Sequence, residues 1–134
     1  YEMKDKKLIT GLKNEKKETP LADIVYIKSE AIHVRVHTLL VCNILFEATM
    51  KGIAECLGKN FMKISRNSVL NLKHIICYCD DAVFVSYQGK LKEFEISEKY
   101  QDETIKWLTT GKVPKRNKEW IYRNEELIVA KEKL

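Results

Sequence analysis

The clearest periodic pattern in the chain is a strict alternation over residues 32 to 37. Aliphatic side chains occupy the even positions and basic or titratable ones the odd positions: Ile32, Val34 and Val36 against His33, Arg35 and His37. Because successive side chains of a β-strand point to opposite faces, this period of two predicts a strand that buries its aliphatics. The opposite face of that strand is basic.

Short apolar runs of strand length recur on both sides of this strand. We expect a first strand at 7–13, a polar turn at 14–17 and a bend at Thr19-Pro20. Further strand-like runs lie at 23–28, 39–45, 61–64 and 69–72. Three strands then form an antiparallel meander, at 74–79, 82–87 and 91–96, with turns at Asp80-Asp81 and Gln88-Gly89.

Two segments carry helical signals instead. Apolar residues at helical spacing, Phe46, Met50, Ile53, Ala54 and Leu57, predict a helix over about 46–57 that Gly58 ends. A second helix, over about 98–110, is expected between a capping Ser97 and Gly111. A basic linker follows, and residues 119–134 fit either a hairpin or a helix. The fold class is therefore mainly β and antiparallel, with two short helices.

Length and composition indicate one globular domain. The 134 residues are 45% apolar and contain only five Gly and two Pro, so the chain is neither disordered nor of low complexity. The longest apolar run, Leu39 to Phe46, is interrupted by Asn43 and is too short to span a bilayer. No signal peptide is visible, and Tyr1 stands where an initiator Met is expected. We expect a cytoplasmic piece of a longer protein, with no membrane contact in this segment.

Four cysteines raise the question of metal or disulfide chemistry. They are Cys42, Cys56, Cys77 and Cys79, with no C-x2-C pair and no paired His spacing. We expect buried, reduced thiols, and Cys77 and Cys79 on one face of a strand; zinc or a disulfide is the alternative. No metal or other cofactor is expected.

Basic residues are concentrated in two acid-free windows. The net charge is +5, yet no acid occurs between Glu55 and Asp80, nor from Ala31 to Phe46. One such window is typical of a solvated face, whereas two favour a polyanionic partner. Catalysis has no comparable support: Ser65, His33 or His37, and Asp80 could supply a triad, but no G-x-S-x-G elbow surrounds the serine. We expect no catalytic residue and no enzyme.

The segment 63–68 has the side chains that bind DNA. Lys63 and Arg66 can neutralise phosphates, and Arg66 can also enter a minor groove. Ser65, Asn67 and Ser68 can hydrogen-bond to phosphate oxygens or base edges. A surface loop that caps its own backbone groups is the alternative interpretation of these residue types.

The string Phe61-Met-Lys-Ile-Ser-Arg-Asn-Ser-Val-Leu-Asn71, followed by Leu72-Lys-His-Ile75, resembles the motif of the LytTR DNA-binding domain, roughly F-x-R-x-H-R-S-x-x-V-N-x-x-x-I. Residues 22–29 resemble that family's "dI-x-yIe" strand, 46–57 its "L-x-x-l-e-x-x-L" helix, and 94–100 its "v-S-x-x-y" junction. The resemblance covers about residues 7–110, within a domain taken as 1–110. Residues 111–134 are an extension outside the pattern.

The resemblance implies an elongated or barrel-like β fold that inserts loops into DNA grooves. It assigns contact to Arg66 first, to Lys99 before the last helix, and to His33 or Arg35 near the start of their strand. Lys63, Ser65 and Asn67 replace the family's usual Arg, His and Ser, which indicates retained contact with altered sequence preference.

The expected function is therefore that of a sequence-specific DNA-binding domain of a bacterial transcriptional regulator. In a two-component system it would be the output module behind an upstream receiver domain. Direct repeats in promoter double-stranded DNA, occupied by a homodimer, are the implied target. The alternative is a protein-interaction or signalling module of the same fold with weak or lost DNA binding, suggested by Ser65, Glu98 and the extension.

Overall fold

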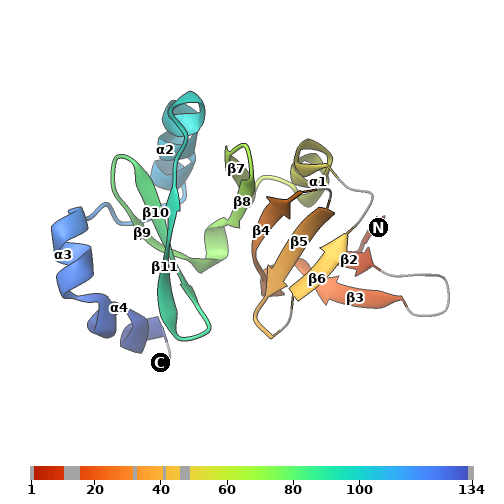
Figure 1. Cartoon of the computed structure of the whole chain (residues 1–134), viewed down its shortest axis with the longest axis horizontal. Coiled ribbons are helices and arrows are strands. Elements are labelled where there is room, and N and C mark those ends of the chain that lie inside the picture. Colours follow the sequence, from red (N-terminus) through yellow and green to blue (C-terminus); the bar gives the residue numbers. More distant parts are fainter. Residues whose placement is uncertain (1, 11–15, 32, 41, 46–48, 133–134) are drawn as a thin grey trace.

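The computed structural model describes residues 2–10, 16–31, 33–40, 42–45 and 49–132. It contains three antiparallel sheets and four α-helices in this described part (Figure 1). The sheets are open, so the barrel-like alternative is wrong and the mainly β, antiparallel class is confirmed. None of the described helices is long and apolar enough to cross a membrane.

The first sheet has the order β1-β2-β3, with β1 (Glu2–Lys4), β2 (Lys7–Thr10) and β3 (Lys17–Pro20). Only part of it was expected from the sequence. The predicted strand at 7–13 is present as β2, and 11–15 lie outside the described residues, but β1 and β3 were missed. Asp5 and Lys6 make the β1–β2 turn with φ of 50° and 61°, although neither is Gly or Asn, which turn patterns usually require there.

The second sheet is the largest and has the order β6-β5-β4-β8-β7. Its strands are β4 (Ile24–Glu30), β5 (His33–Thr38), β6 (Cys42–Leu45), β7 (Phe61–Ser65) and β8 (Ser68–Asn71). Val34 and Val36 are buried on one face against helix α1 (Met50–Leu57), which confirms the alternation. His33, Arg35 and His37 are half-buried on the other face.

The third sheet is the expected meander, in the order β11-β10-β9, with β9 (Ile75–Tyr78), β10 (Ala82–Tyr87) and β11 (Lys90–Glu95). Both faces of it are covered. Val83 and Val85 pack with Tyr26 and Leu70 of the second sheet and with Leu108 of helix α2 (Gln101–Thr110), whereas Ala82 and Phe84 face the C-terminal extension. The third sheet is thus a central layer between the second sheet and the extension.

Both predicted helices exist, with different starts. Helix α1 begins at Met50, because Thr49 is extended and its Oγ1 accepts a hydrogen bond from the Gly52 N–H at 3.0 Å; residues 46–48 lie outside the described part. Before α2, residues Glu98–Tyr100 form a short 3-10 turn, η3, and the Ser97 side chain makes no capping bond. Two further short turns are η1 (Leu21–Asp23) and η2 (Leu72–His74).

The extension is helical, which decides between the two predicted alternatives. It forms α3 (Lys118–Arg123) and α4 (Glu125–Glu132), and Ile121 and Ile128 are buried against Phe84 on the outer face of the third sheet. Backbone bonds from Tyr78 N to Pro114 O (3.1 Å) and from Arg116 N to Tyr78 O (2.8 Å) also attach the linker to the edge of β9. The extension is therefore packed on the rest of the fold.

The cysteines differ in exposure. Cys77 and Cys79 are buried on the same face, and burial raises the pKa of Cys77 to about 11, as expected for an inert thiol. Cys42 and Cys56 are exposed, so the expectation that all four are buried is wrong for these two. All four are free thiols.

Candidate nucleic-acid interface

The predicted contact segment forms a tight hairpin. Ser65 of β7 pairs with Ser68 of β8, so only Arg66 and Asn67 lie in the turn, and the tip of the hairpin projects from the middle of the molecule (Figure 1). Arg66 is exposed, and among the described residues none forms an ion pair or hydrogen bond with its guanidinium. The exposed turn of this hairpin therefore carries a cation without an ion-pair or hydrogen-bond partner in the described part of the chain.

The other side chains of the hairpin are partly used to hold its shape. Ser65 Oγ accepts a hydrogen bond from the Asn67 N–H at 3.3 Å, and Ser29 Oγ of β4 donates to Asn67 Oδ1 at 3.1 Å. The Ser29 N–H also donates to the Asn67 carbonyl at 3.0 Å. Ser68 is only 8% exposed, so its side chain is a structural part of the strand pair and we leave it out of the interface proposed below.

Lys63 and Lys99, 36 residues apart in sequence, meet around one aromatic ring. The ammonium groups of both lie 5.7 Å from the centroid of the Tyr100 ring. The two segments are joined by a hydrogen bond from the Ser97 N–H to the Ile64 carbonyl at 3.1 Å. The structure thus places the second predicted contact region directly beside the first.

The third predicted region lies at the same end of the second sheet. Because β4 and β8 are antiparallel, with Lys28 opposite Ser68, the β4–β5 turn emerges beside the β7–β8 turn. Arg35 is tied to an acid there: its Nε lies 2.7 Å from Glu30 Oε2, and their side chains are 36% and 46% exposed. Hydrogen bonding to Cys42, followed by attraction to Glu30, raises the pKa of the Arg35 guanidinium.

Two features of this end were not found from the sequence. Lys28 is exposed and lies directly opposite Arg35 in the ladder, but it follows an apolar run that indicated only a buried strand. Glu30 precedes the acid-free window by one residue, yet register brings it opposite His33 and into contact with Arg35. A count of acids along the chain cannot show such cross-strand neighbours.

Deeper along the same face, an aromatic cluster joins the second and third sheets. The His37 ring stacks on the Tyr26 ring at 4.1 Å, and Lys92 Nζ donates to Tyr26 Oη at 2.8 Å. Burial, followed by repulsion from Lys92, lowers the pKa of His37, and burial raises the pKa of Tyr26 to about 12. The neutral forms of His37 and Tyr26 are therefore favoured in this junction.

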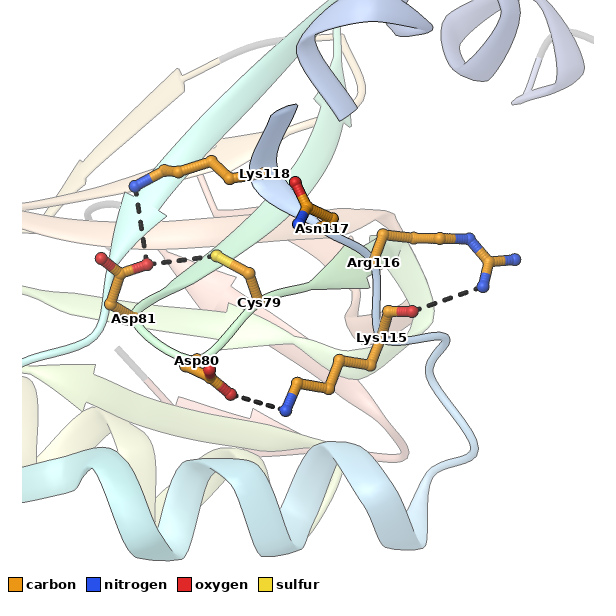
Figure 2. Close-up of a pocket in the computed structure, with 7 residues that line it drawn as sticks. All are labelled: Cys79, Asp80, Asp81, Lys115, Arg116, Asn117 and Lys118. Atoms are coloured by element: carbon orange, nitrogen blue, oxygen red, sulfur yellow. Dashed lines mark hydrogen bonds and ion pairs between the residues drawn. The ribbon is translucent and has the colours of Figure 1, made fainter. Parts of the chain in front are cut away.

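A second group of basic residues lines a pocket at the extension. Figure 2 shows it between the β9–β10 turn and the linker, lined by Cys79, Asp80, Asp81, Lys115, Arg116, Asn117 and Lys118. Its lysines are paired internally: Lys115 Nζ lies 2.6 Å from Asp80 Oδ1, and Lys118 Nζ 3.5 Å from Asp81 Oδ1. Arg116 has no carboxylate partner among the described residues, but its guanidinium donates to the Lys115 carbonyl at 3.3 Å and lies 5.4 Å from the centroid of the Trp120 ring. This pocket is a seam that holds the extension in place.

Comparison with known proteins gives the family of the chain. The family model described as the LytTr DNA-binding domain matches residues 14–109. Among solved structures, the chain is similar to the LytTr DNA-binding domain of a methyl-accepting/DNA response regulator from Bacillus cereus. The TM-score is 0.65 at 14% identity, over 78% of this chain and 98% of that one. A search of curated proteins finds no match.

Proposed function

Because the chain belongs to the LytTR DNA-binding domain family, we propose that it binds promoter DNA through the end of the second sheet where the β4–β5 and β7–β8 turns emerge. The interface comprises Arg66, Lys63, Ser65, Asn67, Lys99, His33 and Arg35. Arg66 is the principal contact, and the lysines contact phosphates.

The observation that carries this proposal is the convergence of three separate basic segments on one end of the fold. Lys63 and Lys99 share the Tyr100 ring, and Arg35 lies in the adjacent hairpin. Arg66 is exposed in the β7–β8 turn, without an ion-pair or hydrogen-bond partner for its guanidinium among the described residues. Lys63, Lys99 and Arg66 have no carboxylate partner among the described residues, and such cations repel one another unless an external polyanion supplies the opposite charge. Duplex DNA presents such charges at regular spacing.

In the wider proposal, the domain is the output module of a cytoplasmic transcriptional regulator. It would act behind an upstream receiver domain and bind direct repeats as a homodimer on DNA, without catalytic activity or a cofactor. Ser65 and Asn67, which are held by hydrogen bonds beside Arg66, would adjust sequence preference by fixing where the arginine points.

Binding of DNA selected from a random pool, measured at several salt concentrations, tests this function. We expect the logarithm of the association constant to fall linearly with the logarithm of salt, with a slope of about −0.9 per phosphate contact. Absent or salt-independent binding would instead favour a protein-interaction module of the same fold.

A further inference from the structure

Two cations oppose each other directly in the β4–β5 ladder. Lys28 is the cross-strand partner of Arg35, and both lie on the face opposite helix α1, since Val34 and Val36 point toward that helix. Like charges at directly opposed positions of an antiparallel pair destabilise it. The free protein therefore holds a local excess of positive charge beside the hairpin turn.

A single carboxylate offsets this excess, and only in part. Glu30 Oε2 lies 2.7 Å from Arg35 Nε, yet Nε has no partner in hydrogen-bonding geometry, so the ion pair is poorly aligned at this atom. Among the described residues, no carboxylate lies within ion-pairing distance of Lys28. Of the two opposed cations, only Arg35 has a carboxylate partner, and that partner is poorly aligned.

We propose that Lys28 and Arg35 form a binding site for a DNA backbone phosphate, and that Glu30 occupies this site in the DNA-free protein. A phosphodiester oxygen offers the same anionic acceptor as a carboxylate, and it can take the directed guanidinium hydrogen bonds that Glu30 leaves unmade. Glu30 then acts as an internal competitor that the phosphate displaces. This inference rests on the proposed function and adds Lys28 and Glu30 to it.

The position of the pair fits a backbone that passes Arg66. Lys28 lies opposite Ser68, next to the turn, and the adjacent Ser29 hydrogen-bonds to Asn67 through both its N–H and its hydroxyl. The displacement costs little, because an ion pair this exposed contributes weakly to stability. Glu30 therefore reduces affinity without blocking binding.

A double-mutant cycle distinguishes competition from simple repulsion. We expect Glu30→Gln to tighten binding of the selected duplex by about two- to fivefold, the size of a weak ion pair. The gain should vanish in an Arg35→Met background, where the guanidinium is gone but most of the aliphatic stem remains. Lys28→Met should reduce both the affinity and the Glu30→Gln gain.

Glu98→Gln is the matched control. Glu98 is an exposed acid beside Lys99 with no ion-pair partner among the described residues, so its removal should strengthen binding equally with and without the Arg35 guanidinium. If Glu30→Gln gives the same gain in both backgrounds, or none in either, competition for Arg35 is overturned. Circular dichroism and urea midpoints of each variant confirm that the domain is folded.

A probe other than DNA separates this proposal from the proposed function. Titration with inorganic phosphate, followed by the Arg35 Nε–Hε signal in nuclear magnetic resonance spectra, should show a response at lower concentration in Glu30→Gln than in the unmodified chain. That result without any DNA binding would retain the phosphate site and reject the promoter function. An identical response in both proteins would reject the phosphate site.

Discussion

Basic side chains are used differently at the two ends of this molecule. In the extension, Lys115 and Lys118 lie within 2.6 Å and 3.5 Å of the carboxylates of Asp80 and Asp81. At the hairpin end, Lys63 and Lys99 contact an aromatic ring, and Arg66 has no charged partner among the described residues. These four lysines look alike in the sequence, but only Lys63 and Lys99 have no carboxylate partner among the described residues.

The difference arises from what each segment faces. The linker to α3 packs against the acidic β9–β10 turn, so Lys115 and Lys118 are paired with the carboxylates of that turn. The hairpin faces Tyr100 and the β4–β5 turn, where Glu30 is already engaged with Arg35. A cation that the fold leaves without a carboxylate partner is the stronger indication of an external anion, and finding one needs a structure.

The largest expected effect in the comparison of the two ends is a loss of folding stability caused by a substitution in the extension. Ile121 is fully buried against the outer face of the third sheet, so Ile121→Ala should lower the free energy of unfolding by about 2–5 kcal/mol through lost burial and a cavity. Urea denaturation measures this loss. Leu127→Ala is the control, since that side chain is 52% exposed and should change stability by only about 0.5 kcal/mol or less.

In the hairpin, by contrast, a substitution should change DNA affinity and leave folding stability unchanged. Arg66→Ala should weaken DNA binding by about 1–3 kcal/mol without unfolding the domain, because the side chain is exposed and supports no contact within the described fold. Affinity for the selected duplex and the urea midpoint should be measured on the same preparation. An unchanged affinity in a folded variant would remove Arg66 from the interface.

The spacing of apolar residues and the residue types at turns were enough to predict much of this fold. The alternation at residues 32–37 identified β5 and its buried Val34 and Val36, and the Gln88-Gly89 turn, with both φ values positive, identified the β10–β11 hairpin. Turns with positive φ that contain neither Gly nor Asn were not predicted. Ala31 adopts φ of 53° in the β4–β5 turn, although an alanine carries no turn signal.

The same limit applied to the candidate site. Spacing and motif located the hairpin at Arg66, because its residues are contiguous in the chain. The Arg35–Glu30 ion pair and the opposition of Lys28 and Arg35 depend on the register of β4 and β5. This register cannot be read from the composition of a sequence segment. Ser68 shows the reverse case: its side-chain chemistry suggested contact, but strand pairing buried it.

A smaller effect should separate phosphate contact from structural pairing. Lys63→Met retains apolar bulk and removes the charge, so it should weaken binding to all duplexes about equally and reduce the salt slope by about 1. Salt titrations with selected and unrelated duplexes measure this. A loss confined to the selected sequence would show that Lys63 reads bases instead of phosphates.

Acidification should affect the hairpin half before the extension. The folded-state pKa of His37 is lowered by burial and Lys92, so the unfolded chain binds a proton first, and stability falls as pH drops below about 6.5. Asp81 has a pKa lowered below 3.8 by Cys79 and Lys118, so its contribution persists until far lower pH. Urea midpoints at about pH 7.5 and about pH 5.5 should differ less in His37→Phe, which keeps a stacking ring without titrating. An equal pH dependence in both proteins would mean that another titrating group, and not His37, causes the loss of stability.

The smallest effect should come from Lys118→Met, which tests the paired half of the comparison directly. Lys118 Nζ lies 3.5 Å from Asp81 and 3.8 Å from Glu93, but its side chain is 39% exposed, and an ion pair so accessible to water contributes little net stability. We expect the urea midpoint to move only slightly and DNA affinity to stay unchanged, although the substitution removes the same charge as Lys63→Met. A loss of affinity matching that of Lys63→Met would mean that DNA responds to net charge alone, and the distinction between paired and unpaired cations would fail.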